Sequence, residues 1–320
     1  MPDVKFDKST IPDLSGRNIL ITGGTGGIGA EITVELAKHN PKRIIFTGRN
    51  AKAADAVLGR IKSAAAGTKA SFVQCDLGSL KSVNQAADEI LAQLDHLDIF
   101  LANAGVMVIP AGLSTDGYEN HFAINHLGHA LLTKRLLALL ERTADTGVDV
   151  RVIYTTSLGW KNGGLDFDRL NTTMESAVLG RWIRYSNSKL ANMLHAREIA
   201  RRHPKLLSFS VHPGAIDTAL ISDLKFSDRV FVKTTMYGQF ISLEQGTFNH
   251  LWAVSAPRDS IQPGGFYEPA GVYSSEELAK TKAERFGKQL WEHTEKALAK
   301  SLSGVAALVG SLAIGSSMVC

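Results

Sequence analysis

The stretch RNILITGGTGGIG, residues 17–29, decides the fold. A β-branched run, NILIT, leads into a cluster of glycines, and the helical pattern EITVELAKHN follows. Glycines at a strand-to-helix turn let the backbone bend tightly and approach a pyrophosphate, whose charge is stabilised by the free N–H groups and the positive dipole end of the helix. The stretch predicts a dinucleotide-binding turn in which Gly23, Gly27 and Gly29 are the key positions, with Thr25 and Ile28 between them.

Further apolar runs repeat this alternation of strand and helix. KRIIFTGRN, KASFVQCDL, LDIFLANAG, VRVIYTTS and LSFSVHPGAI read as strands, with GGFYEPAG as a further candidate, and helical patterns such as HFAINHLGHALLTKRLLALL separate them. Continuous apolar strands are typical of a parallel sheet covered on both faces. The chain is therefore predicted to be α/β: a single doubly wound Rossmann-type domain (1–300) with a parallel sheet flanked by helices, plus a C-terminal apolar tail (301–320).

Composition limits the other function classes. The net charge is +4 and the sequence pI about 9.0, but basic and acidic residues are mixed, and the densest basic cluster, REIARRHPK, reads as a solvated helix end. This predicts no nucleic-acid partner. Cys75 and Cys320 are too few for a disulfide framework, and the charged N-terminus lacks a secretory pattern, so a cytoplasmic location is expected. His126 and His129 have no further ligand cluster beside them, which predicts no metal site.

The tail has no charged side chain. Residues 302–320 have about the length that a helix needs to cross a bilayer, but they are rich in glycine and serine. Three alternatives stay open for the tail. It associates with a membrane, packs against another subunit, or frays. A homo-dimer or homo-tetramer is expected.

A tyrosine and a lysine stand four residues apart in RYSNSKLAN, residues 184–192. At 3.6 residues per turn, Tyr185 and Lys189 share one helix face. A nearby ammonium favours the phenolate, so Lys189 is predicted to lower the pKa of Tyr185 and make the phenol a proton donor and acceptor at neutral pH. The alternative is an ordinary surface pair. The first interpretation is favoured because the other candidate residues also follow strands, where ligands bind in such sheets.

The end of the second strand predicts which dinucleotide is used. An acidic side chain there would hydrogen-bond the adenosine ribose, but FTGRN has none. Gly48 leaves room, and Arg49 can pair with a 2′-phosphate, which favours NADP(H) over NAD(H). The alternative is that Arg49 points into solvent.

These motifs together resemble the short-chain dehydrogenase/reductase family over nearly the whole chain. Ala102 departs from the usual Asn of the fourth-strand motif, and Gly26 beside Gly27 also fits an extended, epimerase-like branch. INHLGHALLT, YSNSKLAN and LWEHTEKAL look most like retinol-dehydrogenase-like and WW-domain-oxidoreductase-like members, without a WW domain. By resemblance, further cofactor-binding residues are Asp76, Leu77, Asn103, Ala104, Gly105, Pro213, Gly214 and Thr218, together with Tyr185 and Lys189.

The resemblance also implies a catalytic set of Asn125, Ser157, Tyr185 and Lys189. In carbonyl reduction Tyr185 would give the proton, Ser157 would orient the carbonyl oxygen, and Lys189 would also bind the nicotinamide ribose. Asn125 would hold a water that relays protons to Lys189. Taken singly, Ser157 could be a strand-end hydroxyl and Asn125 a satisfied helix amide.

Two segments are predicted to shape the substrate site, residues 158–184 and residues 219–240. Their apolar and aromatic side chains suit a lipid-like, steroid-like or polycyclic carbonyl or alcohol, and the alternative for each is simple packing. Two other functions stay open, a cofactor-bound interaction protein without turnover and an epimerase or dehydratase. The predicted pocket walls are Trp160, Trp182, Phe231, Met236 and Tyr237.

Overall fold

One twisted sheet organises the chain, as the sequence predicted. The computed structural model describes residues 4–175, 179–216, 229, 234, 239–274 and 280–315. The strand order is β10-β9-β6-β5-β4-β1-β2-β3, and only β10 runs antiparallel to its neighbour. The strands are β1 (Asn18–Thr22), β2 (Arg43–Gly48), β3 (Ala70–Gln74), β4 (Ile99–Ala102), β5 (Arg151–Thr155), β6 (Leu207–Val211), β9 (Phe266–Glu268) and β10 (Val272–Tyr273).

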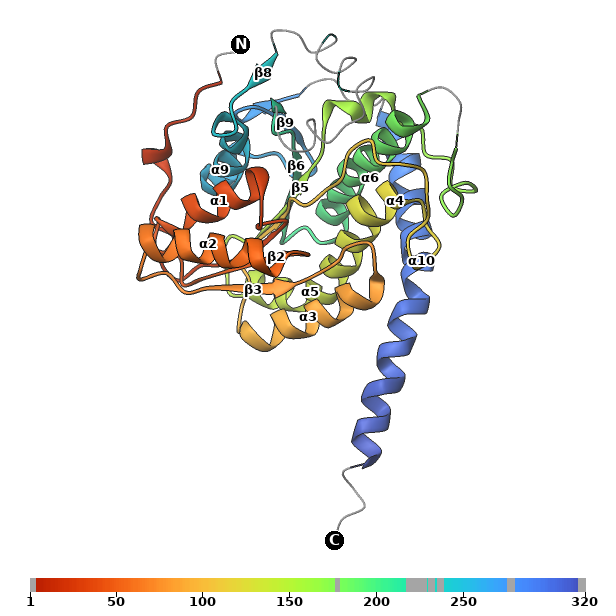
Figure 1. Cartoon of the computed structure of the whole chain (residues 1–320), viewed down its shortest axis with the longest axis horizontal. Helices are drawn as coiled ribbons and strands as arrows, with labels where there is room; N and C mark the ends of the chain where they lie inside the picture. Colours follow the sequence, from red (N-terminus) through yellow and green to blue (C-terminus); the bar gives the residue numbers. More distant parts are fainter. Residues whose placement is uncertain are drawn as a thin grey trace.

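Helices cover both faces of this sheet (Figure 1). Within β1, Ile19 and Ile21 face the core beneath α1 and α2, while Leu20 faces the core beneath α3, α5 and α6. This alternation explains the continuous apolar run, because both faces of the strand are buried. The first layer holds α1 (Gly27–Ala37), α2 (Ala51–Ala64) and α9 (Phe248–Ser255), and the second holds α3 (Leu80–Gln93), α5 (Gly128–Asp145), α6 (Gly180–Arg202) and α10 (Lys280–Gly315).

The helix before β5 contains a wider turn that the sequence did not predict. A short α4 (Asn120–Phe122) passes into a π-helical segment, η2 (Ala123–Leu127), before α5 begins. Such π turns occur often at functional sites. Four 3₁₀ turns and a small separate sheet complete the described chain: η1 (Lys8–Thr10), η3 (Leu158–Asn162), η4 (Gln245–Thr247), η5 (Arg258–Ser260), β7 (Ala215–Ile216) and β8 (Phe240–Ile241).

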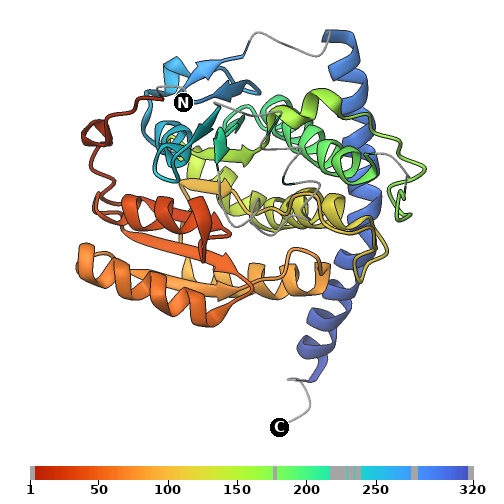
Figure 2. The ribbon, with the colours of Figure 1, turned by 45° about the horizontal axis from the view of Figure 1, so that its top comes forward.

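Helix α10 continues without a break across the predicted start of the tail. At 1.5 Å per residue its 36 residues extend over about 54 Å. Leu290 and Leu298 are buried in the core, and Thr294 Oγ1 lies 2.9 Å from His126 Nε2. The end of the helix extends beyond the body of the molecule in Figures 1 and 2. Among the described helices, none combines the length and the apolar character that a membrane span requires.

Candidate active site

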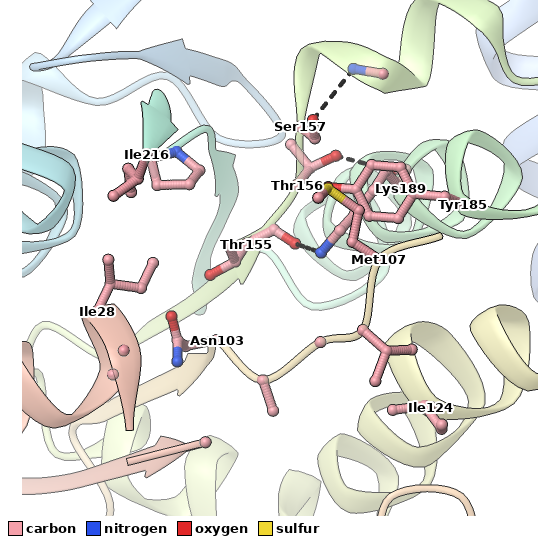
Figure 3. A pocket seen from close by; sticks show the side chains of 18 of the residues that line it. Ile28, Asn103, Met107, Ile124, Thr155, Thr156, Ser157, Tyr185, Lys189 and Ile216 are labelled. Carbon is pink, nitrogen blue, oxygen red and sulfur yellow. Dashed lines mark hydrogen bonds between the residues drawn. The ribbon is translucent and has the colours of Figure 1, made fainter. Parts of the chain in front are cut away.

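A cavity of about 970 Å³ opens at the carboxyl ends of the strands. Side chains and backbone from the turn after β1, the ends of β2 to β6 and the start of α6 line it (Figure 3). Thr218 lies outside the described residues, as do Phe231, Met236 and Tyr237, and Asn125 does not line the cavity. The predicted residues that do line it are Gly23, Thr25, Gly27, Ile28, Gly29, Arg49, Asp76, Leu77, Asn103, Ala104, Gly105, Ser157, Tyr185, Lys189, Pro213 and Gly214.

Close backbone approach explains the glycines of the turn. A Cβ atom on Gly23, whose φ is +71°, would lie 2.9 Å from Ala104 Cα. A Cβ atom on Gly29 would lie 2.2 Å from the Gly23 carbonyl oxygen. Gly27 also has a positive φ, +53°, but no atom of the described residues lies within 4 Å of a Cβ placed there. The turn therefore packs tightly against the loop after β4 at two positions and leaves open space at the third.

A layer of hydrogen bonds lies beneath the glycine turn, and the sequence analysis did not predict it. Thr22 Oγ1 accepts from the N–H groups of Asn103 (2.9 Å) and Ala104 (3.0 Å), so its own proton is directed to His129 Nε2 at 2.8 Å. His129 Nδ1 then donates to the Asn125 carbonyl oxygen at 2.9 Å. Burial lowers the pKa of His129 to about 4, which keeps the ring neutral. His129 thus connects structural elements, and only contacts distant in sequence reveal this role.

Ser157, Tyr185 and Lys189 meet on one wall of the cavity (Figure 3). Ser157 follows β5 and caps η3, where its Oγ accepts from the Gly159 N–H at 3.2 Å. Tyr185 and Lys189 come from the first turns of α6. The Lys189 ammonium donates to the Thr155 carbonyl oxygen at 3.2 Å and lies 5.8 Å from the centroid of the Tyr185 ring. The structure therefore brings these three predicted residues together.

The pKa values of the pair differ from the sequence prediction. Burial raises the pKa of Tyr185, and a hydrogen bond with Ser157 acts in the opposite direction without cancelling that rise. The predicted lowering is therefore wrong, because the Lys189 ammonium is directed to the Thr155 carbonyl rather than to the phenol oxygen. Burial lowers the pKa of Lys189 itself to about 8. At neutral pH the phenol keeps its proton and the amine is mostly charged.

Asn125 lies behind the cavity, in the π turn. Its Oδ1 accepts from the Val106 N–H at 2.8 Å, and its Nδ2 donates to the Val106 carbonyl at 3.0 Å and to Ser188 Oγ at 2.8 Å. The side chain thus fixes the loop after β4 against α6. The water relay predicted for Asn125 stays a prediction.

The substrate side of the cavity confirms one predicted wall residue and corrects another. Trp182 lines the cavity, but Trp160 is only 6% exposed and packs against Phe266 at a ring distance of 6.1 Å, so its assignment as a wall was wrong. Trp160 lies in η3, and its ring packs against Phe266 of strand β9 rather than facing the cavity. Further apolar residues line the cavity: Leu158, Leu179 and Ile183 lie in the predicted segment 158–184, whereas the sequence analysis missed Val106, Met107, Ile124 and Ile216.

Arg49 and Asp76 lie at the other end of the cavity. Both side chains are exposed on its lining. Asn50, next to Arg49, caps α2 by accepting from the Ala53 N–H at 3.0 Å. Asp76 Oδ1 accepts from the Gly78 N–H at 2.9 Å, which orders the loop after β3. A cation beside a helix N-terminus is an arrangement that suits an anionic group.

Several known proteins are similar to this chain. Residues 17–165 match the family described as short chain dehydrogenase. A short-chain dehydrogenase/reductase of Aspergillus calidoustus is 32% identical over 306 residues, covering 91% of this chain and 96% of the relative. Retinol dehydrogenase 11 of Homo sapiens is 32% identical over 238 residues, covering 72% of each chain. A solved structure from Mycobacterium Paratuberculosis superposes with a TM-score of 0.70 at 25% identity, covering 91% of this chain and 97% of that one. The chain therefore belongs to the short-chain dehydrogenase/reductase family, in its retinol-dehydrogenase-like branch.

Proposed function

We propose that this oxidoreductase transfers a hydride between NADP(H) and the carbonyl or secondary alcohol of a hydrophobic small molecule. The observation that carries the proposal is the convergence of Ser157, Tyr185 and Lys189 on a cavity whose opposite end is the glycine turn. A proton donor, a hydroxyl and a cation thus face a space that is large enough for a dinucleotide and a substrate together.

The residues of the cavity fit a nicotinamide dinucleotide. The open space at Gly27 lies at the N-terminus of α1, where free N–H groups and the helix dipole suit a pyrophosphate. The buried Asn103 Oδ1 has no hydrogen-bond partner among the described residues and can accept from a bound ligand. When bound, the nicotinamide supplies or accepts the hydride.

The protein's own residues then handle the proton. In carbonyl reduction Tyr185 donates its phenolic proton to the carbonyl oxygen, and its raised pKa keeps that proton in place at neutral pH. Ser157 hydrogen-bonds the same oxygen and orients it. Lys189, charged and held by the Thr155 carbonyl, would hydrogen-bond the nicotinamide ribose. In alcohol oxidation the same phenol must first lose its proton and act as the base.

The apolar side chains around the cavity support a hydrophobic substrate. Met107, Leu158, Trp182 and Ile183 contribute to its lining. The name of retinol dehydrogenase 11, a relative with 32% identity, points to an isoprenoid alcohol as the first class to test. NADPH consumption with a panel of apolar aldehydes and ketones tests the proposal. Cofactor binding without consumption of any carbonyl would instead favour a protein that binds the dinucleotide for an interaction role.

Changing Arg49 to Asp should narrow or reverse a preference for NADPH over NADH. A charge-assisted pair with the 2′-phosphate is worth about 1.5–3 kcal/mol, which corresponds to roughly tenfold to hundredfold in dissociation constant. Fluorescence titration of both cofactors measures this ratio. Arg49→Lys is the matched control and should keep most of the preference, since it keeps the charge. Equal dissociation constants for NADPH and NADH in the unchanged protein would rule out the assignment.

Removing residues 301–320 should leave turnover on a water-soluble carbonyl largely unchanged. The cut falls after the buried Leu298, and among the described side chains it removes two hydrogen bonds of Ser301, from Asn84 Nδ2 to its carbonyl at 3.4 Å and from its Oγ to the Leu298 carbonyl at 2.9 Å. A cut after Gly287 is the control and should prevent folding, because Leu290, Thr294 and Leu298 are then lost from the core. We also propose that the tail associates with membranes, in which case the shorter chain moves from pellet to supernatant on fractionation. A tail-free chain that fails to fold would show instead that residues 301–320 pack on the domain.

A further inference from the structure

Residues 106–109 of the loop after β4 are held to the rest of the protein at two points, one at each end of this segment. At the first, the backbone N–H and carbonyl of Val106 both bond to the Asn125 side chain. At the second, the Ile109 N–H donates to His121 Nε2 at 3.1 Å, and the Ile109 carbonyl accepts from Arg184 Nη2 at 3.3 Å. Only Met107 and Val108 lie between these two points, so their positions are determined from both sides.

The backbone between the two points is strained. Val108 has φ of +55°, in the left-handed region that a β-branched residue rarely adopts. Such a conformation costs on the order of 1–3 kcal/mol and persists only where the surroundings enforce it. The Val108 side chain is 5% exposed and packs with Met107, Trp182 and Phe240. The strain thus directs these apolar side chains together on the substrate side of the cavity.

Three buried polar residues hold the backbone at Ile109, the second of the two points. Glu119, His121 and Arg184 are 1%, 0% and 2% exposed. Because the Ile109 N–H donates to Nε2 of His121, that nitrogen is the acceptor and Nδ1 carries the proton, which it donates to Glu119 Oε1 at 2.8 Å. Arg184 Nε lies 3.3 Å from the same oxygen. Glu119 in turn fixes which ring nitrogen of His121 can accept from the loop.

A carboxylate is required at position 119. Its oxygens accept from two donors, His121 Nδ1 and the Phe122 N–H, the latter at 2.9 Å from Oε2, and the Arg184 cation forms an ion pair with Oε1. A glutamine would place an NH₂ group against either His121 or the Phe122 N–H, which are both donors. Arg184 further donates to the Met174 carbonyl at 3.3 Å, in the segment between η3 and α6. The cluster thus joins the loop after β4, the π turn region and the insertion before Tyr185.

We infer that Glu119, His121 and Arg184 are positioning residues that set Met107 as a substrate wall in the cavity that Tyr185 also lines. The inference rests on the proposed function for its substrate. Arg184 immediately precedes Tyr185, the His121 ring packs edge-on to the Tyr185 ring at 6.4 Å, and Met107 and Tyr185 both line the cavity. Figure 3 labels Met107, Tyr185 and Lys189 among the side chains that line this cavity. Among the described residues, no hydrogen bond or ion pair joins the cluster to the Tyr185 hydroxyl or to Ser157, so we expect it to act on substrate fit rather than on proton transfer.

Hydrogen exchange at the Ile109 amide tests the positioning directly in the full chain. His121→Phe keeps a ring but removes both the acceptor and the donor, so exchange at Ile109 should become at least about tenfold faster. His121→Gln keeps one acceptor and one donor and should restore most of the protection. His195→Phe is the matched control, because His195 is equally buried but contacts Trp291 and Tyr154, away from the loop. Unchanged exchange at Ile109 in His121→Phe would overturn the positioning role, whatever the substrate is.

Steady-state kinetics with two aldehydes separate an effect on the position of the Met107 wall from an effect on the reaction step. For retinal, a long apolar aldehyde, KM should rise at least about tenfold in His121→Phe and Glu119→Gln, while kcat changes less than about threefold. For benzaldehyde, which does not reach past the reacting carbon to the wall, both constants should stay near those of the unchanged enzyme. Equal KM increases for the two aldehydes would overturn the wall assignment. A parent chain that consumes NADPH with neither aldehyde contradicts the proposed function instead, and the exchange result still decides the positioning role.

Discussion

Phenylalanine in place of Tyr185 should lower turnover at least ~10²-fold, with the dissociation constant of NADPH little changed. The substitution keeps the ring and its packing against His121 and removes only the hydroxyl that can give a proton to the substrate oxygen. The free energy of unfolding should barely change, which distinguishes a chemical role from a packing role. Steady-state kinetics and a denaturant titration on the same preparation measure both quantities.

Tyr154, in strand β5, offers a matched control for Tyr185. The Tyr154 hydroxyl is buried and bonds to Thr133 Oγ1 at 2.6 Å, so Tyr154→Phe should cost stability but not turnover. In alcohol oxidation the phenol of Tyr185 must be deprotonated. Because burial raises its pKa, the oxidation rate should still be climbing at pH ~10, the ordinary tyrosine value. A Tyr185→Phe enzyme with the normal rate would make Ser157 or a bound water the proton source.

Methionine in place of Lys189 should abolish most of the turnover and at the same time stabilise the fold. Burial lowers the pKa of this amine from 10.5 to about 8, so the unfolded chain holds its proton more tightly than the folded one. At about 1.4 kcal/mol per pKa unit, burial of the charge costs about 3 kcal/mol below pH 8. The substitution removes this cost but also loses the hydrogen bond to the Thr155 carbonyl, which is worth about 1 kcal/mol. The folded variant should therefore be more stable than the parent by about 1–2 kcal/mol at pH 7.

The stability advantage of Lys189→Met over the parent protein should depend on pH. In the parent protein the penalty is complete below pH 8 and disappears as the pH rises from 8 to 10.5, so the advantage of Lys189→Met should shrink over that window. Urea unfolding at pH 7 and at pH 10 measures it. The variant should also bind NADPH more weakly if Lys189 contacts the ribose. A variant that is less stable than the parent at pH 7 would show that the Lys189 ammonium is better satisfied in the fold than its burial implies.

Local sequence signals were enough to predict the fold and the main part of the site. The turn from Gly23 to Gly29 is encoded by residues adjacent in sequence, and each apolar run predicts a buried strand on its own. Because parallel strands end at one edge of the sheet, residues that follow β1, β4, β5 and β6 necessarily converge there. This is why Asn103, Ser157 and Pro213, which the family resemblance assigned to the site, line one cavity.

Features that depend on contacts distant in sequence could not be predicted. The π turn at Asn125 and the inward turn of Trp160 follow from packing against segments far along the chain. The pKa of Tyr185 was predicted in the wrong direction because helical spacing places Lys189 near the ring but does not fix where its ammonium points. The cluster around Glu119 was missed because no short motif contains all its members.

The ring of His129 has a consequence for anyone who would redesign this protein. Its two nitrogens join Thr22, under the glycine turn, to the carbonyl of Asn125, whose side chain holds the loop after β4. His129 therefore joins the glycine turn to the loop after β4. Substitution of Thr22 or Asn125 should disturb both of these segments. Arg49 lies outside these segments, on the exposed rim. If Arg49 selects the cofactor as proposed, its substitution should change the cofactor and leave the choice of substrate unchanged.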